Sequence, residues 1–411
     1  MKYVNSLKTM SGFDSAVKAG DISQKRAREL CEKMGRVHMG TRCICLPKGS
    51  AGYACAIMLE AVIKNAGHRV GRLTSAADFD ARASIFINGA LPSIADFNTA
   101  VAELRAAVHK MSEPCLKEEA TFALSMLLFK LCDCDYVILQ GLSDQSFALD
   151  AICAPFELIV MPTVYDESEQ GMARLKAACD SVRRGTREVV SGNQKSEIYN
   201  QISNACAMSG IRLYIPVKAQ YRVTEMTAKR LRFGYCDKDD YCLRSPSEIL
   251  QNGAMTVIES ALALRRGGVK LPWSSIAAGL ESVTGTGAFD LISMMPLAVA
   301  DIASNRREAE MLLATVCALW GNEKKLTLCV RAEDADADEL LAVFAEQNIK
   351  RVILVGSSSK IYPDATRYEL VRDAAAEFFA PTEADELFLC FGGVQFASEI
   401  RAEIMKQMNV V

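Results

Sequence analysis

The sequence predicts an α/β protein with a mostly parallel sheet, helices on both faces and a second, smaller domain. Apolar, β-branched runs alternate with amphipathic helical patterns through most of the chain, and this alternation is typical of parallel sheets covered by helices. With 411 residues, the chain exceeds the size at which one hydrophobic core usually stops growing. A composition shift late in the sequence gives a place for the boundary between two domains.

Three candidate strands and one helix organise the first part of the chain. The strands are Cys43–Leu46, Tyr136–Leu139 and Leu158–Met161. The segment Ala54–Ala66 places its apolar residues on one helical face and ends at Gly67, a common helix stop. Strand, glycine-bearing loop and helix follow in that order, which is the geometry in which a phosphate binds helix N-terminal amides.

The expected domain boundary lies in a stretch rich in Gly, Ser and Thr at residues 282–287. Strand and helix patterns resume after it, with candidate strands at Leu326–Val330, Arg351–Val355 and Leu387–Phe391. We therefore expect one domain over residues 1–283 and a smaller α/β domain over residues 284–411.

Composition and charge exclude two classes of partner. A formal net charge of -3 gives no basic surface of the kind that nucleic acids require. No stretch approaches the roughly 20 apolar residues of a membrane helix, and the first residues do not resemble a secretory signal. The 15 cysteines are scattered without zinc spacing, so we expect reduced core residues. These features indicate a cytoplasmic protein with no membrane and no nucleic-acid partner.

A series of short motifs follows a specific order along nearly the whole chain. They are NAGHRVGRLTS (Asn65–Ser75), INGALPS (Ile87–Ser93), ALSMLLFK (Ala123–Lys130), YVILQG (Tyr136–Gly141), GAFDLISMMPLAVADIASN (Gly287–Asn305) and FLCFGGVQFASEIR (Phe388–Arg401). In this order they resemble folylpolyglutamate synthase/dihydrofolate synthase of the Mur ligase superfamily. The resemblance implies a P-loop-type first domain, like the central domain of Mur ligases, and a Rossmann-like second domain.

The resemblance also implies an activity: the family ligates glutamate to folate through an acyl phosphate made from ATP. ATP and magnesium are the cofactors expected from the family. A folate-like or nucleotide molecule in the cleft between the domains, and a monomeric state, are further expectations. Such phosphoryl transfer depends on a P-loop lysine, a Ser or Thr hydroxyl that holds magnesium, and additional metal ligands.

The P-loop signature of the family is altered here. Counting back from Gly67 places the family's Gly-Lys-Gly-Ser/Thr on residues 51–54, so Gly52 replaces the lysine and the hydroxyl is lost. A Lys-Gly-Ser sequence lies four residues upstream, and a slipped loop would use it, although Pro47 precedes it where the family has glycine. The nucleotide-binding candidates are therefore Lys48, Gly49, Ser50 and Gly52.

The family's metal ligands are also replaced. Gln140 stands where a glutamate supports magnesium, and a neutral amide is a poorer ligand for a hard cation. Asp166 and Glu167 are the nearest counterparts of a later Asp-His pair, with Glu169 as the alternative if the loop is not shortened. Their carboxylates remain candidate magnesium ligands, with a solvated acidic loop as the plainer interpretation.

In the second domain, Asp301 and Asn305 of the family's Asp-x-Ala-His-Asn segment remain, while the histidine is Ser304. We keep Asp301 and Asn305 as catalytic candidates and Asn305 as a nucleotide contact. Ser75 remains from a Ser-Pro-His substrate loop that otherwise reads Ala-Ala. All three histidines of the chain lie between residues 38 and 109, upstream of both family histidines.

Two main hypotheses follow. Each lost stabilising group typically costs about 2.7 to 4 kcal/mol in the transition state, which favours a catalytically degenerate ligase (a pseudoenzyme) retained for ligand binding or regulation. The alternative is an active, divergent acid–amino-acid ligase that uses Lys48 with Asp166 and Glu167. A third possibility is unrelated chemistry on the same fold, because fold does not fix function.

Overall fold

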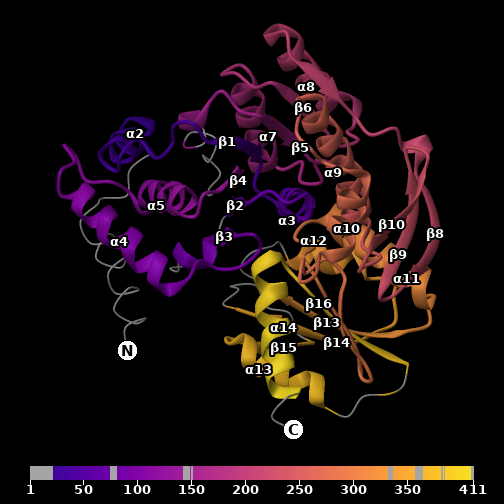
Figure 1. Cartoon of the computed structure of the whole chain (residues 1–411). Helices are drawn as coiled ribbons and strands as arrows, with labels where there is room; N and C mark the ends of the chain where they lie inside the picture. Colours follow the sequence, from indigo (N-terminus) through magenta and orange to yellow (C-terminus); the bar gives the residue numbers. More distant parts are fainter. Residues whose placement is uncertain are drawn as a thin grey trace. The chain divides into compact units, whose positions relative to one another are not determined.

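The structure is a computed structural model, and it describes residues 22–74, 81–141, 149, 151–331, 337–356, 364–380, 383 and 385–408. The chain divides into two compact units, one of residues 1–218 with 253–280 and one of residues 219–252 with 281–411. Figure 1 labels their helices and strands. The boundary that the sequence analysis places after residue 283 stays a prediction.

The first unit contains a seven-stranded sheet in the order β3-β2-β4-β1-β5-β6-β7. The strands are β1 (Arg42–Leu46), β2 (Val70–Leu73), β3 (Ile85–Ile87), β4 (Tyr136–Gln140), β5 (Leu158–Met161), β6 (Glu188–Ser191) and β7 (Arg212–Tyr214). Neighbouring strands pair in parallel, except that β3 runs antiparallel to β2. The carboxyl ends of β2, β4, β1 and β5 therefore meet at one edge of the sheet.

Helices cover both faces of this sheet. One face packs against α2 (Gln24–Lys33), α4 (Ile94–Val108), α5 (Lys117–Leu131), α7 (Glu169–Val182) and α8 (Ser196–Ser209). The other face carries α3 (Ser50–Asn65), with α10 (Trp273–Ser282) and the part of α9 (Glu248–Arg266) from Gly253 onward packed on it. A Cβ on Gly279 would lie 2.5 Å from the Cα of Val62, so only glycine allows α10 to approach α3 so closely.

The mostly parallel sheet is confirmed, and so are the strands predicted from the sequence in both units, to within two residues at each end. The predicted start of the first helix at Ala54 is wrong, because α3 begins at Ser50. Its first helical hydrogen bond runs from Tyr53 N to Gly49 O, at 2.8 Å. Residues 50–53 show no apolar periodicity, so the sequence pattern revealed only the later turns.

The second unit has a six-stranded sheet in the order β11-β12-β16-β13-β14-β15 and a three-stranded sheet in the order β10-β9-β8. The strands are β8 (Arg222–Thr227), β9 (Arg230–Tyr235), β10 (Lys238–Leu243), β11 (Asp290–Met294), β12 (Leu297–Asp301), β13 (Lys325–Arg331), β14 (Ile349–Val355), β15 (Ala365–Tyr368) and β16 (Glu386–Phe391). The smaller sheet is antiparallel, whereas the larger one is parallel apart from β11.

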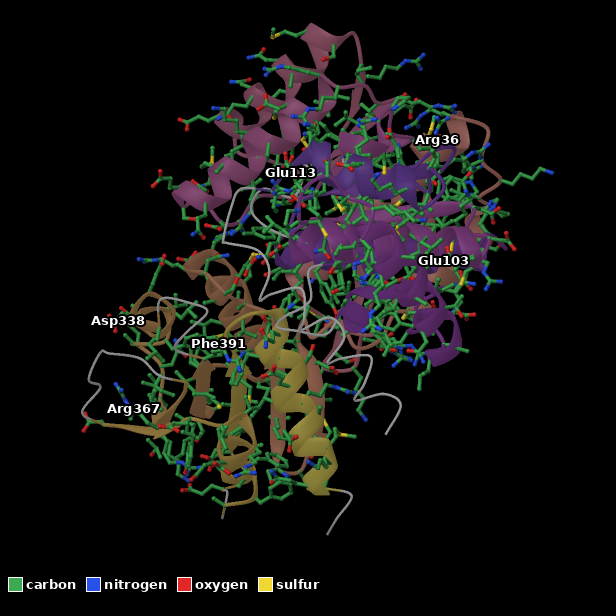
Figure 2. The ribbon with its side chains drawn as sticks, turned by 90° about the vertical axis from the view of Figure 1, so that its left-hand side faces the viewer. Arg36, Glu103, Glu113, Asp338, Arg367 and Phe391 are labelled. Atoms are coloured by element: carbon green, nitrogen blue, oxygen red, sulfur yellow. The ribbon has the colours of Figure 1, made fainter. Side chains whose placement is uncertain are left out.

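The larger sheet of the second unit also has helices on both faces. They are α11 (Arg306–Trp320) and α12 (Ala337–Val343) on one face, and α13 (Val371–Ala376) and α14 (Val394–Met408) on the other. In β16, Phe391 joins the core under α11 and α12, and Phe388 contacts Phe378 on the opposite face. Figure 2 shows Phe391 within this unit and Arg367 on β15, the last strand in the sheet order. No helix of the described residues is long and apolar enough to cross a membrane.

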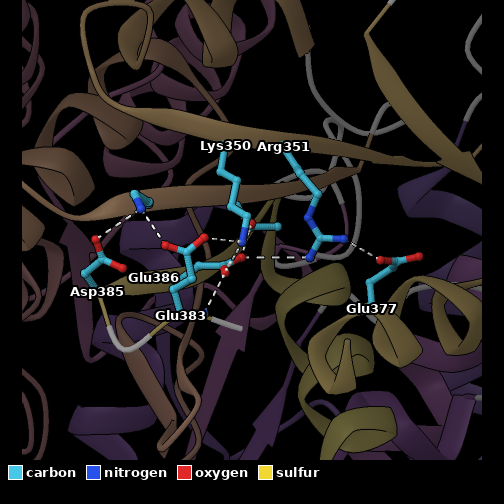
Figure 3. A network of polar contacts seen from close by, with 8 residues as sticks. Lys350, Arg351, Glu377, Glu383, Asp385 and Glu386 are labelled. Atoms are coloured by element: carbon cyan, nitrogen blue, oxygen red, sulfur yellow. Dashed lines mark hydrogen bonds and ion pairs between the residues drawn. The ribbon is translucent and has the colours of Figure 1, made fainter. Parts of the chain in front are cut away.

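A network of charged side chains holds the amino-terminal end of β16 (Figure 3). The Glu386 side chain is only 1% exposed and accepts hydrogen bonds from Lys350 Nζ at 2.8 Å and Thr327 Oγ1 at 2.7 Å. Burial by itself raises the pKa of Glu386, but these donors and the Glu383 amide outweigh it and lower the pKa. The network lies at the sheet edge opposite the carboxyl ends of the strands, so we assign it a structural role.

Glu119 anchors α2 to α5 in the first unit. Its buried carboxylate accepts hydrogen bonds from Ser23 N at 2.7 Å and Leu116 N at 3.0 Å. The guanidinium group of Arg26 donates to both carboxylate oxygens, at 3.1 and 2.8 Å. One carboxylate therefore satisfies backbone amides before both helices.

We predict that Glu119→Gln lowers the free energy of unfolding by about 1.5 to 3 kcal/mol, the usual contribution of hydrogen bonds to a charged group. Glu118→Gln is the matched control, because Glu118 shares the first turn of α5 but not the network. Urea denaturation followed by circular dichroism measures both. Equal losses in the two variants would show that only the helix dipole is involved.

The second prediction concerns acid unfolding of the second unit. Because the pKa of Glu386 is lowered in the folded state, its contribution to stability is present above the unfolded-state pKa and disappears as the pH falls through the folded-state pKa. Lys350→Met removes the nearer of its two cations, since Arg351 Nη2 lies 3.8 Å from Glu386 Oε1, so this variant should unfold at a higher pH than the wild type. Trp320 fluorescence in a Trp273→Phe background reports on this unit.

Lys406→Met is the control for this experiment, since Lys406 forms an exposed pair with Glu403 at 3.5 Å. An exposed pair contributes little to stability. If Lys350→Met and Lys406→Met unfolded at the same pH, the role given to Glu386 would be wrong.

Candidate functional site

The candidate site lies at the carboxyl edge of the first sheet, where a loop of three residues joins β1 to α3. Gly49, with φ 128°, is the residue before the helix. A Cβ on Gly52 would lie 2.0 Å from the carbonyl oxygen of Pro47, closer than any real contact. The Pro47 backbone therefore packs directly against the first turn of α3 at Gly52.

Gln140, at the end of β4, ties this loop to the sheet. It is 3% exposed, its Oε1 accepts a short hydrogen bond from Thr74 Oγ1, and its Nε2 donates to Gly49 O at 3.4 Å. Both ends of the amide are thus engaged within the protein. Gln140 is placed as a structural link between β2, β4 and the loop, and this arrangement does not fit a magnesium ligand.

Lys48 and Ser50 lie on either side of Gly49, at the end of the β1–α3 loop and the start of α3. Lys48 lies before the helix and is half-buried, and none of the described carboxylates forms an ion pair with it. Ser50 is the first residue of α3 and is 6% exposed. Lys48 is the cation of this loop, since Gly52 carries no side chain.

Asp166 and Glu167 follow β5, and both carboxylates face cationic side chains. Asp166 Oδ2 lies 3.2 Å from Arg174 Nη1, and Glu167 Oε1 lies 2.5 Å from Lys195 Nζ. A Cβ on Gly171 would lie 2.0 Å from Asp166 O, so the loop packs tightly against α7. Neither carboxylate is presented as a free metal ligand, and among the described residues no three His, Cys, Asp or Glu side chains gather into a metal site.

Asp301 is buried at the end of β12 in the second unit. Its two oxygens accept hydrogen bonds from Phe289 N at 2.6 Å and Ala303 N at 2.8 Å. Burial raises its pKa to about 7, although both hydrogen bonds oppose the rise. The carboxyl group joins the start of β11 to the end of β12, and such a position is suited to holding the backbone.

Asn305 caps α11. Its side-chain oxygen accepts a hydrogen bond from Glu308 N at 3.0 Å, while the buried Glu308 carboxylate accepts from Ser304 N at 2.9 Å and Ser304 Oγ at 3.0 Å. This reciprocal arrangement is a form of helix capping. The remaining candidate, Ser75, lies outside the described residues.

Sequence reasoning missed two residues of the carboxyl edge. Thr74 supplies the hydroxyl that engages Gln140. Gln194 follows β6 and clamps the loop after β5, because its Nε2 donates to Pro162 O at 2.9 Å and its Oε1 accepts from Val164 N at 3.0 Å. Both contacts join residues far apart in sequence, and no local pattern signals them.

The structure thus brings some of the candidate site residues together at one loop and places the others elsewhere. Lys48, Gly49, Ser50, Gly52 and Gln140 meet at the β1–α3 loop. Asp166 and Glu167 follow a strand of the same sheet edge and form ion pairs, of which the Glu167–Lys195 pair is exposed. Asp301 and Asn305 belong to the second unit.

Solved structures of one kind of enzyme resemble this chain over nearly its full length. Mycobacterium tuberculosis folylpolyglutamate synthase complexed with ADP has a TM-score of 0.82 at 18% identity, over 98% of this chain and 99% of that one. Thermotoga maritima folylpolyglutamate synthase gives 0.80 at 17% identity, over 99% and 98%. A folylpolyglutamate synthase–AMPPCP–folate complex gives 0.80 at 18%, over 96% and 98%. No protein-family model and no curated protein matches the sequence.

These likenesses define a two-domain α/β fold. More specifically, the chain has the fold of folylpolyglutamate synthases, as the order of its sequence motifs implied.

We predict that Gly52→Ala destabilises the protein by about 1 to 3 kcal/mol, because overpacking forces the Pro47 carbonyl to move. Gly267→Ala is the milder control, since the nearest atom to its added Cβ lies at 3.3 Å. Urea midpoints compare the two. A neutral or stabilising Gly52→Ala would mean that the loop is open rather than closed.

Proposed function

We propose that this protein is a catalytically degenerate relative of folylpolyglutamate synthases that is retained to bind a folate-like small molecule. The observation that carries the proposal is the contact between Pro47 and Gly52. The carbonyl oxygen of Pro47 occupies the space in which a side chain on residue 52 would begin. Phosphoryl transfer relies on cations that neutralise the phosphates, and the family's position for such a cation is closed.

Two further observations support the loss of ligase chemistry. Gln140 uses both ends of its amide within the protein, and Asp166 and Glu167 are engaged by Arg174 and Lys195. Magnesium would have to displace these partners. A bound folate-like molecule is supported by the fold, because a solved structure with this fold is a complex with folate and AMPPCP.

The alternative, an active and divergent ligase, is favoured by one observation. Lys48 lies in the β1–α3 loop without an ion pair to any described carboxylate. A loop rearrangement that opened the contact to Gly52 would allow its ammonium group to reach phosphates. Asp166 and Glu167 would then have to leave their partners to bind magnesium.

Calorimetry with ATP, with and without magnesium, separates the two functions. The degenerate protein should show no saturable heat at millimolar ATP, and Lys48→Ala should behave like the wild type. Folate titrated into the same samples should bind without ATP. Lys64→Ala, an exposed lysine of α3, controls for a general change in charge.

Tight, magnesium-dependent ATP binding that is lost in Lys48→Ala but kept in Lys64→Ala would overturn the proposal. Glutamate addition to folates would then be the assay to run. Absence of both ATP and folate binding would reject the folate-binding part and leave the loss of ATP chemistry standing.

A further inference from the structure

A buried ion pair joins β2 and α3 on the α3 face of the first sheet. Arg72 of β2 and Glu60 of α3 are 4% and 3% exposed. Arg72 Nε donates to Glu60 Oε2 at 2.6 Å, and Gly89 N donates to Glu60 Oε1 at 2.6 Å. Both carboxylate oxygens are engaged, so the guanidinium group is held in one place.

The pairing with Glu60 does not use all the N–H donors of this guanidinium group. Arg72 Cζ lies 4.1 Å from the centre of the Phe86 ring on the paired strand β3. Arg72 Nη1 is buried and has no hydrogen-bond partner among the described residues. A buried donor without a partner is costly, above all on a charged group. An acceptor supplied by a bound molecule would remove that cost.

Tyr53 provides a second polar group on the same side of α3. It precedes Glu60 by seven residues, which is about two helical turns and therefore the same face. Its hydroxyl forms no hydrogen bond with the described residues. Burial raises the pKa of Tyr53, Arg72 partly opposes the rise and Glu60 adds to it. The hydroxyl is therefore protonated at neutral pH and is a donor.

The charges decide which acceptor fits. Arg72 and Glu60 already neutralise each other at 2.6 Å. An anionic ligand would leave a net negative charge in a buried place, which is unfavourable. A neutral carbonyl oxygen accepts hydrogen bonds from both donors without adding charge.

We propose that Arg72 Nη1 and Tyr53 Oη form a subsite for the neutral, amide-type carbonyl oxygen of a small molecule. The subsite deepens the proposed ligand-binding function and rests on it, but it needs neither ATP nor magnesium. Glu60 acts as a positioning residue. Gly89 N donates to its Oε1, and its Oε2 accepts from Arg72 Nε and so fixes the guanidinium group.

Benzamide and benzoate are matched probes, because they share size and shape and differ in charge. Each is titrated without ATP into protein labelled with ¹⁵N-arginine, and the Arg72 Nε–H signal is followed by NMR. Benzamide should shift this signal saturably, and benzoate should bind at least several-fold more weakly. Tyr53→Phe should weaken benzamide binding about fivefold, as expected for one neutral hydrogen bond. Tyr199→Phe, on α8, is the control.

The double variant Glu60→Met/Arg72→Met guards against a folding artefact. Replacing a buried ion pair by apolar residues is often tolerated, whereas removing one partner is not. The double variant should fold, lose benzamide binding and identify the Arg72 signal by its absence.

Three results would each overturn the subsite. They are no saturable benzamide shift in the wild type, tighter binding of benzoate than of benzamide, and unchanged benzamide binding in Tyr53→Phe. None of these bears on the calorimetry with ATP and folate, so the subsite and the proposed function fail separately.

Discussion

The close contact between the Pro47 carbonyl oxygen and the first turn of α3 is the constraint on which the conformation of the β1–α3 loop depends. A side chain on residue 52 would begin 2.0 Å from that oxygen, so the closed loop and the glycine require each other. Gln140 adds hydrogen bonds that join the loop to β2 and β4. A P-loop binds phosphates at a strand-to-helix loop of this kind.

The sequence predicted the fold well because the fold depends on patterns that are local or repeated. Runs such as Leu158–Met161 and Leu387–Phe391 are apolar throughout, as expected for strands buried on both faces. The start of α3 escaped prediction because Gly49 ends the loop without a capping side chain. The placement of residues 219–252 with the second unit involves contacts over long sequence separations, which no local pattern records.

The sequence named candidate residues, but it carried no information on their side-chain partners. The sequence analysis placed Lys48 and Gly52 after one strand and Gln140 at the end of another, and in the structure Gln140 Nε2 donates to Gly49 O of the β1–α3 loop. The sequence could not reveal that Asp166 faces Arg174, since an acidic residue in a loop has the same sequence signature whether it is solvated, metal-bound or paired. The Arg72–Glu60 pair was equally hidden, because the two residues are twelve positions apart and on different elements.

The central claim is that the β1–α3 loop is closed in a way that excludes nucleotide phosphates. A crystal structure grown with millimolar ADP and magnesium tests it most directly. We predict that the Pro47 carbonyl stays against Gly52, that Gln140 keeps its bonds to Thr74 and Gly49, and that no nucleotide density lies at the loop. An opened loop with Lys48 and magnesium on the ADP phosphates would contradict this account.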